Sequence, residues 1–318
     1  MKKLSIRLAL AILLLSFIPQ NAQAARLLVP GGQVVGLELH NDTLTVVDFE
    51  ADSPAADKLK RGDCLVSLNG QAITQPEDIR NGLLKSSGTV SLTVRRGEKL
   101  HTIKIKPTIT ESGPKLGIYL RQGITGIGTV TWYDPDTGDF GTLGHGVNDS
   151  AGHLIALKSG NVYSATVASV RKGRCGDPGQ LMGSLRSPAA LGSLSRNTSQ
   201  GVFGKMDSPI NSTRLPADSS SVKTGSATIL TTVEGTAVRE YSVEILKVYP
   251  SSRQTGRNML IKVTDPALLS ITGGIVQGMS GSPIIQDGKL IGAVTHVLVN
   301  DPTTGYGIFI ENMLNAAA

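Results

Sequence analysis

The sequence is poor in charged and aromatic residues, and these shortages exclude several classes of protein. Only 18% of its 318 residues are charged and 4% are aromatic, whereas 40% are hydrophobic. A disordered chain is typically highly charged and poor in apolar residues, and a coiled coil is rich in Glu, Lys and Leu. Neither class fits. The 37 glycines and 15 prolines instead favour many short strands joined by turns.

Cysteine is also scarce, since Cys64 and Cys175 are the only two. Neither has a CxxC partner or a histidine at metal-binding spacing, so we predict no metal site and no cofactor. The two cysteines lie in different predicted domains. We therefore expect two unpaired, buried thiols, with a disulfide as the alternative that export would allow.

The N-terminus has the three-part pattern of a secretory signal. A basic start precedes an apolar run over residues 8–18, and Ala22-Gln23-Ala24 supplies the small residues that a signal peptidase reads. The run is too short for a comfortable membrane span. We predict a signal peptide over 1–24, with an uncleaved anchor as the alternative. This segment carries half of the net charge of +6, and without a basic stripe the remainder does not indicate nucleic-acid binding.

Residues 27–106 have the pattern of a small α+β module. A helix is predicted over 76–84, and alternating apolar residues predict strands over 64–68, 90–94 and 100–105. Asn69-Gly70 is a tight-turn signal that follows the first of these strands. Residues 107–114, which begin and end with proline, are predicted to be a linker.

The motifs Ser53-Pro54-Ala55-Ala56, Arg61-Gly62-Asp63-Cys64-Leu65 and Asn69-Gly70 resemble PDZ domains, especially the circularly permuted bacterial kind. Such domains bind extended peptide ends by adding a strand to a sheet edge. The resemblance places the peptide-binding loop at Val35-Gly36-Leu37-Glu38-Leu39, where Glu38 stands in a position in which glycine is common. The alternative is a packing module without a peptide ligand.

Residues 115–318 show glycine-punctuated apolar strands, which predict a mainly β domain built as a barrel or double barrel. Residues 176–225 are rich in Gly and Ser and are predicted to hold long loops. The alternation of apolar and polar residues that predicts strands returns over 227–233, 237–248 and 259–263.

The segment Gly278-Met279-Ser280-Gly281-Ser282-Pro283 carries the clearest chemical signal. A serine on a glycine-flanked turn exposes its hydroxyl, and the nearby N–H groups of Gly278 and Ser280 can form an oxyanion hole. The layout resembles the nucleophile region of trypsin-like serine proteases, Gly-x-Ser-Gly-Gly-Pro. Ser282 replaces the second glycine of that pattern.

A nucleophilic serine needs a base, normally an imidazole. His145, within Leu143-Gly144-His145-Gly146-Val147, follows a predicted strand, and its flanking glycines leave the ring accessible. We predict His145 as the base. His296 lies on the strand after the serine hairpin, where it is a candidate for selecting an acidic substrate side chain.

The residues alone do not identify the group that orients the imidazole. Asp265, fifteen residues before Ser280, is one candidate, but an Asp followed by Pro266 also fits a helix N-cap. Asp149 and Asp177 are alternatives by spacing.

Three long motifs resemble the SpoIVB peptidase family (stage IV sporulation protein B), and the resemblance extends over essentially the whole chain. They are Gly141-Thr142-Leu143-Gly144-His145-Gly146-Val147, Gly273-Gly274-Ile275-Val276-Gln277-Gly278-Met279-Ser280-Gly281-Ser282-Pro283-Ile284, and Gly292-Ala293-Val294-Thr295-His296-Val297 with Asn300-Asp301-Pro302 after it. The resemblance implies a PDZ domain followed by a trypsin-like double β-barrel. It also implies Ser280 as nucleophile, His145 as base and Asp265 as the orienting acid.

The resemblance further implies a serine endopeptidase made in the forespore of endospore-forming bacteria and exported into the space between the two spore membranes. There it is expected to cleave itself and then a membrane-bound inhibitor of an intramembrane metalloprotease, which releases a mother-cell sigma factor. Its PDZ domain is expected to recognise the chain itself and to hold the target. Contact with the membrane is expected at most through the N-terminal segment. The alternative function is a PDZ adaptor with an inactive barrel.

Overall fold

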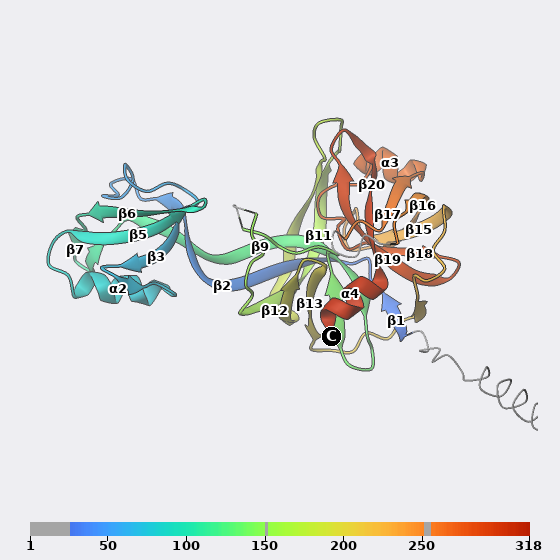
Figure 1. Ribbon diagram of the computed structural model, residues 1–318, viewed down its shortest axis with the longest axis horizontal. Coiled ribbons are helices and arrows are strands. Elements are labelled where there is room, and N and C mark those ends of the chain that lie inside the picture. Colours follow the sequence, from blue (N-terminus) through green and yellow to red (C-terminus); the bar gives the residue numbers. More distant parts are fainter. Residues whose placement is uncertain (1–25, 150–151, 251–255) are drawn as a thin grey trace, which may run out of the picture.

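The computed structural model describes residues 26–149, 152–250 and 256–318. The signal segment predicted over 1–24 lies outside the described residues. The described chain is mainly β, as predicted, with a smaller lobe joined by two long strands to a larger body (Figure 1). None of its helices in these ranges is long and apolar enough to cross a membrane.

The strands are β1 (Arg26–Pro30), β2 (Val34–Phe49), β3 (Cys64–Leu68), β4 (Gln71–Ala72), β5 (Val90–Arg96), β6 (Lys99–Ile105), β7 (Thr108–Thr110), β8 (Gly113–Lys115), β9 (Ile118–Tyr133), β10 (Asp139–Thr142), β11 (Ser159–Arg171), β12 (Gln180–Thr198), β13 (Gly201–Met206), β14 (Leu215–Ala217), β15 (Gly225–Thr231), β16 (Arg239–Val248), β17 (Met259–Val263), β18 (Pro283–Gln286), β19 (Lys289–Leu298) and β20 (Asp301–Phe309). The helices are α2 (Pro76–Leu84), α3 (Pro266–Thr272) and α4 (Ile310–Ala317).

The larger body contains two antiparallel barrels, and their pairings each close a ring of six strands. The first barrel runs β2-β9-β10-β13-β12-β11 and returns to β2. The second runs β15-β16-β17-β20-β19-β18 and returns to β15. Alternate residues of these strands point inward, as in the buried–exposed pattern of β16, so each barrel encloses its own apolar core. The predicted double barrel is confirmed.

The smaller lobe contains α2 and the sheet formed by β3, β5, β6 and parts of β2 and β9. Helix α2 spans Pro76–Leu84, the range predicted from the sequence, and it buries Ile79 and Leu83. The core of this lobe extends from Leu44 to Leu116 and includes Ile118 and Leu120 at its edge.

The two long strands β2 and β9 belong to both parts of the molecule. In β2, residues 34–39 pair with β9 and β11 in the first barrel, and residues 44–49 pair with β9 in the smaller lobe. The predicted module boundary at residue 27 therefore needs correction, because the preceding strand β1 also pairs with β9 of the barrel. The predicted linker over 107–114 contains the hairpin β7–β8, and β8 contacts α2.

The loops predicted over 176–225 are largely strand instead. Strand β12 alone runs for 19 residues and pairs with both β11 and β13. Its many Gly and Ser residues are weak strand formers, and long-range pairing with two neighbours overrides that preference.

The two cysteines are both free, as expected, but only Cys64 is buried. Cys175 is exposed, which corrects the prediction of two buried thiols.

Candidate active site

Ser280 lies on a tight turn between α3 and β18. The glycines on either side of it adopt backbone angles that side chains rarely tolerate, since Gly278 has φ +100° and Gly281 has φ +97°. An added Cβ on Gly281 would lie 2.0 Å from the carbonyl oxygen of Thr129, so the loop passes directly against β9. Glycine is therefore required here by both conformation and space.

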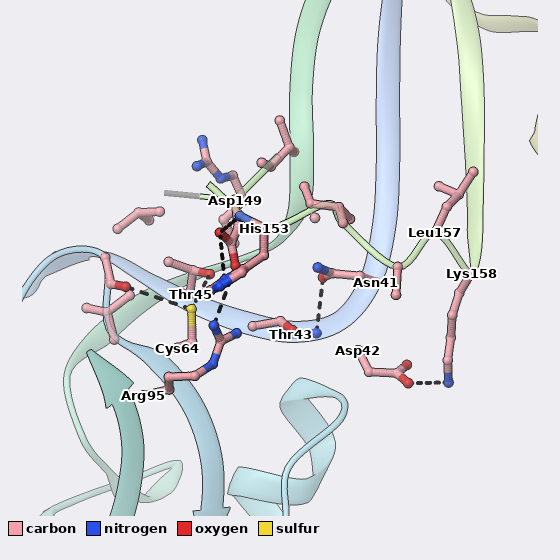
Figure 2. A pocket seen from close by; sticks show the side chains of 18 of the residues that line it. Asn41, Asp42, Thr43, Thr45, Cys64, Arg95, Asp149, His153, Leu157 and Lys158 are labelled. Atoms are coloured by element: carbon pink, nitrogen blue, oxygen red, sulfur yellow. Dashed lines mark hydrogen bonds and ion pairs between the residues drawn. The ribbon is translucent and has the colours of Figure 1, made fainter. Parts of the chain in front are cut away.

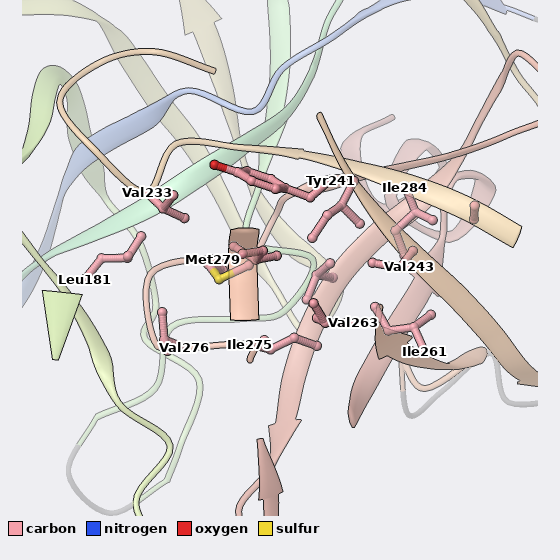
Figure 3. Close-up of a cluster of buried hydrophobic side chains, with 14 of the residues drawn as sticks. Leu181, Val233, Tyr241, Val243, Ile261, Val263, Ile275, Val276, Met279 and Ile284 are labelled. Carbon is pink, nitrogen blue, oxygen red and sulfur yellow. The ribbon is translucent and has the colours of Figure 1, made fainter. Parts of the chain in front are cut away.

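Apolar residues just before Ser280 anchor this loop in the core of the second barrel. Ile275, Val276 and Met279 are each almost fully buried there. Figure 3 shows these side chains beside Leu181, Val233 and Tyr241. A loop with three buried anchors holds its backbone in one place, which a catalytic turn needs.

Two buried threonines of β9 fix the loop from the other side. The hydroxyl of Thr129 donates to the carbonyl of Gly278 (2.8 Å), and its N–H donates to the carbonyl of Ser280 (3.0 Å). The hydroxyl of Thr131 donates to the carbonyl of Gly281 (2.7 Å). The sequence analysis missed both residues. Their spacing of two on one strand places them on one face, but nothing local indicates what that face contacts.

The two peptide groups that matter for an oxyanion hole are held through their carbonyls. Gln277 accepts a hydrogen bond from the N–H of Leu181 (2.8 Å), and Met279 accepts from the N–H (3.0 Å) and hydroxyl (2.7 Å) of Ser282. Because a peptide group is planar and trans, its N–H points opposite to its carbonyl. The N–H groups of Gly278 and Ser280 therefore have fixed directions. Among the described residues, neither donates a hydrogen bond.

His145 follows a strained turn at the end of β10. Leu143 has φ +69°, which is unusual for a residue with a side chain, and Gly144 donates its N–H back to the carbonyl of Thr142 (2.9 Å). This is the geometry of a γ-turn, a rare and strained conformation. It turns the chain out of the barrel and brings the His145 segment against β19, where the Cβ position of Gly144 lies 2.8 Å from Cγ2 of Thr295.

The ring of His145 has one defined hydrogen bond. Its Nδ1 lies 2.9 Å from the carbonyl oxygen of Gly146. A carbonyl only accepts, so Nδ1 carries the proton and the neutral ring has its lone pair on Nε2. Burial lowers the pKa of His145 below its ordinary value of 6.5, and the hydrogen bond to Gly146 opposes this only in part.

Ser280 and His145 each contact one of two neighbouring residues of β19. Ser280 contacts Thr295, and His145 contacts His296. The hydroxyl of Ser280 donates to the carbonyl of Thr295 (2.8 Å), and the ring of His296 lies 5.2 Å from that of His145, centroid to centroid. Desolvation, the nearby His145 and Arg257 lower the pKa of His296 to about 4. His296 is thus neutral near pH 7. Among the hydrogen bonds of the described residues, the Ser280 hydroxyl donates to Thr295 and not to His145.

Asp265, predicted as the orienting acid, caps helix α3 instead. One carboxylate oxygen accepts hydrogen bonds from the N–H groups of Ala267 (2.9 Å) and Leu268 (3.0 Å), and the other accepts from Ser242 (3.3 Å). The helix-cap alternative is therefore the one that the structure supports. Asp177 pairs with Arg171, and Asp149 forms an ion pair with Arg95 and has one carboxylate oxygen 3.7 Å from Nδ1 of His153.

We expect Asp265→Asn to leave turnover almost unchanged, because Asn caps a helix about as well as Asp. Asp265→Ala should lower the free energy of unfolding by about 1 kcal/mol, the usual cost of a lost cap, and should also keep its turnover. Thermal unfolding and kcat/KM measured on both variants test this. A steep fall in kcat/KM for Asp265→Asn at unchanged stability would contradict the capping role.

A separate groove lies on the smaller lobe between α2 and the start of β9. It has a volume of about 400 Å³, and its apolar lining includes Ile79, Leu83, Leu116, Ile118 and Leu120. Residues 118–122 of β9 pair with β2 along one edge, and in the described part of the chain no strand pairs with the other edge. An open strand edge beside a helix is the geometry that receives an added peptide strand.

The predicted peptide-binding loop at Val35-Gly36-Leu37-Glu38-Leu39 does not lie in this groove. These residues belong to β2 and are paired with both β9 and β11, so the strand has no free edge there. The predicted position of the peptide-binding loop is therefore wrong. The same apolar–Gly–apolar pattern recurs at Leu116-Gly117-Ile118, where Gly117 has φ +64° and the chain enters β9 beside α2.

A further cavity of about 610 Å³ lies where the smaller lobe meets the first barrel (Figure 2). Its lining includes Cys64, Arg95, Asp149 and His153, and contains neither Ser280 nor His145. Arg95 of β5 pairs with Asp149, which also pairs with His153. The Arg95–Asp149 pair ties the smaller lobe to the segment that follows His145.

Comparison with known families divides the chain into two matched regions. A family model described as SpoIVB peptidase S55 matches residues 113–314, and a PDZ domain model matches residues 33–106. These matches define a PDZ domain followed by a domain of a peptidase family. The chain belongs to the SpoIVB peptidase family S55, as the sequence motifs indicated.

Individual relatives match parts of the chain. The chain is 28% identical over 154 residues to the protein Atu1380 of Agrobacterium fabrum, covering 47% of this chain and 39% of that protein. It is 32% identical over 63 residues to the serine protease HTRA1 of Xenopus tropicalis, covering 20% of this chain and 14% of that protein. The chain thus spans well under half of either curated relative.

Among solved structures, the PDZ domain of the SdrC-like protein from Listeria monocytogenes is 30% identical, covering 25% of this chain and 87% of that one, with a TM-score of 0.23. The active form of the Rv3671c protease from M. tuberculosis is 17% identical, covering 61% of this chain and 75% of that one, with a TM-score of 0.38.

Proposed function

We propose that the chain is an endopeptidase in which Ser280 is the nucleophile and His145 the general base. The observation that carries the proposal is the pair of amide groups at Gly278 and Ser280, whose directions are fixed by hydrogen bonds to the carbonyls of Gln277 and Met279. Fixed donors beside a serine hydroxyl are what stabilisation of an oxyanion requires. An adaptor with an inactive barrel has no need of them.

In the proposed mechanism, the Ser280 hydroxyl leaves the Thr295 carbonyl and attacks the carbonyl carbon of the scissile peptide, while Nε2 of His145 takes its proton. The N–H groups of Gly278 and Ser280 bind the oxyanion. His145 then gives the proton to the leaving amine as the C–N bond breaks. Water, deprotonated by His145, attacks the acyl group and restores the Ser280 hydroxyl.

The edge of β19 beyond Thr295 is the proposed place for the substrate backbone. Residues 296 and 297 pair with β20 on one side, and β18 pairs with β19 only up to residue 293. An extended peptide can therefore add to this edge next to Ser280. The ring of His296, which lies 5.2 Å from that of His145, is neutral, because its pKa of about 4 leaves it uncharged at neutral pH. It therefore supplies no charge to attract an acidic side chain.

The pH dependence of kcat/KM tests the role of His145. Protonation of His145 removes the acceptor for the serine proton, and its pKa is held below 6.5 by burial. We expect one acid limb with a midpoint below 6.5 and full activity above it. His296, with a pKa of about 4, adds no second limb near neutrality.

The matched variant is His145→Gln, which keeps a polar side chain but cannot accept the proton at neutral pH. Cleavage of denatured casein by the wild-type chain and by this variant gives the comparison. Wild-type turnover in His145→Gln would refute the assignment. An acid limb centred at about 7 or higher, as a carboxylate-paired imidazole produces, would contradict the lowered pKa of His145.

We further propose the biological role that family membership suggests. The chain is exported from the forespore into the space between the spore membranes, cleaves itself, and then cleaves a membrane-bound inhibitor of an intramembrane metalloprotease. The groove between α2 and β9 would hold an extended segment of the target. In an endospore former lacking its own family S55 peptidase, the chain should restore mother-cell sigma factor activation. Failure to restore it, despite casein cleavage in vitro, would reject this role alone.

A further inference from the structure

We propose that Arg257, which lies two residues before β17, selects substrates that carry an Asp or Glu side chain two to four residues from the scissile bond. The inference rests on the proposed function, because it concerns the substrate of the Ser280 site. Three observations carry it. They are the place of the Arg257 backbone, the way its exposed side chain is held, and the charges around it.

The backbone on either side of Arg257 is fixed next to the site. A Cβ added to Gly256 would lie 3.9 Å from the carbonyl oxygen of Gly144, the last residue before the proposed base. On the other side, the N–H of the fully buried Asn258 donates to the carbonyl of Gly307 in β20 (2.8 Å). Arg257 is therefore held between the turn that carries the base and β20.

The side chain of Arg257 lies over an aromatic ring of β20. Its guanidinium carbon is 5.1 Å from the centre of the Tyr306 ring. Such a cation–π contact holds the cation in place, and the five N–H donors of a guanidinium form a rigid fork that matches a carboxylate. Because the side chain is ordered before a substrate arrives, less entropy is lost when a carboxylate binds.

Tyr306 connects Arg257 to the centre of the site. In the pairing of β19 with β20, Tyr306 lies opposite His296, whose ring is 5.2 Å from that of His145. The carbonyl of Tyr306 also accepts a hydrogen bond from the hydroxyl of Thr295 (3.1 Å), the residue whose own carbonyl accepts from the serine. The cation therefore lies one strand away from the residues that contact the serine and the base.

The same pairing sets which face of the sheet Arg257 shares with a bound substrate. Residues directly opposite each other on paired strands lie on the same face, so His296 and Tyr306 share one. A substrate strand added to the free edge of β19 places alternate side chains on that face. An extended chain advances about 3.3 Å per residue, so a side chain a few residues from the scissile bond can approach the guanidinium.

The charge of Arg257 has no acidic partner within the chain. Among the ion pairs of the described residues, none includes Arg257, and the sequence outside the described ranges contains no Asp or Glu. Desolvation lowers the pKa of His296, and the charges of His145 and Arg257 add to this effect. A substrate carboxylate would therefore enter a region whose fixed charge is positive, where it is attracted.

The test uses cleavage sites in casein as the source of peptides. Sites that the wild-type chain cuts in denatured casein are mapped by mass spectrometry. One of them is made as synthetic peptides in which each position near the scissile bond carries Glu, Gln or Lys in turn. We expect kcat/KM to favour Glu over Gln roughly 10-fold at one or more positions two to four residues from the bond. The preference should shrink at high ionic strength, because screening weakens the attraction.

Variants of Arg257 assign this preference to its charge. Arg257→Gln should bring the Glu peptides down to the level of the Gln peptides. Arg257→Lys should retain part of the preference, because the charge is kept without the fork, and Arg257→Glu should favour Lys instead. The matched control is Arg239→Gln, which removes an exposed arginine of the same barrel that lies 3.7 Å from Glu234. It should keep the wild-type preference.

The outcomes separate the role of Arg257 from the proposed function. Equal cleavage of Glu and Gln peptides by the wild type, or an unchanged preference in Arg257→Gln, would overturn the inference. A loss of the same size on Glu and Gln peptides in Arg257→Gln would also overturn it, since that is the effect of packing over Tyr306 alone. Cleavage of these peptides by Ser280→Ala at the wild-type rate would instead reject the proposed function.

Discussion

Replacing Ser280 with alanine is expected to abolish peptide hydrolysis while leaving the fold intact. The substitution removes the attacking oxygen, so kcat/KM should fall by roughly 10⁴-fold or more. The structural cost is small, because the hydroxyl makes a single hydrogen bond in the described structure, to the carbonyl of Thr295. A net loss of about 1 kcal/mol in the free energy of unfolding is the usual cost of losing one such bond.

The matched control is Ser270→Ala, which removes an exposed hydroxyl on α3 from the same barrel. It should keep wild-type kcat/KM and thermal stability. Cleavage of denatured casein and thermal unfolding, measured on both variants and the wild type, give the comparison. Residual turnover of Ser280→Ala above one tenth of the wild type would show that another group carries the reaction.

Replacing Gly281 with alanine should have the second-largest effect, and it should act on stability as well as activity. The new Cβ would lie 2.0 Å from the carbonyl oxygen of Thr129 and 2.6 Å from the N–H nitrogen of Leu143, and Gly281 has φ +97°. Overpacking and the unfavourable φ together should lower the free energy of unfolding by about 3–4 kcal/mol. The clash separates the serine turn from β9 and from the strand that leads to His145.

Activity should fall with stability, because the same contacts align the oxyanion donors with the base. We expect a loss of roughly 100-fold in kcat/KM at a temperature where the variant is folded. Gly288→Ala is the matched control, since Gly288 has φ +74° but no atom within 4 Å of its Cβ position. The Gly288→Ala substitution should lower the free energy of unfolding by about 1 kcal/mol, through φ alone, and should keep full activity. Equal effects of the two substitutions would contradict the packing account.

Elements with strong local signals were predictable from the sequence. Helix α2 has proline at its first turn and acidic residues beside it, and it occupies the predicted range. The strand predicted over 259–263 is β17, because its alternation matches a barrel strand with one buried face. The serine turn was also visible, since its glycines mark both a tight turn and a close approach of backbone.

The failures concern features that depend on distant pairing. An apolar–Gly–apolar pattern occurs at both 35–37 and 116–118, and only the pairing of β9 with β2 decides which copy lies beside α2. Strand β12 looks like a loop by composition, and its two neighbours make it a strand.

Asp265 shows a different limit of sequence analysis. The family resemblance favoured a catalytic role, while its position before Pro266 favoured a cap. The local preference decided the outcome in the structure, where Asp265 accepts two hydrogen bonds from the first turn of α3.

The most direct measurement of the central claim is the mapping of a covalent serine probe on the intact chain. The account predicts that a fluorophosphonate reacts at neutral pH with Ser280, identified by mass spectrometry of the modified peptide, and that His145→Gln reacts much more slowly. A stable adduct on another serine, or no adduct on a chain that cleaves casein, would contradict it.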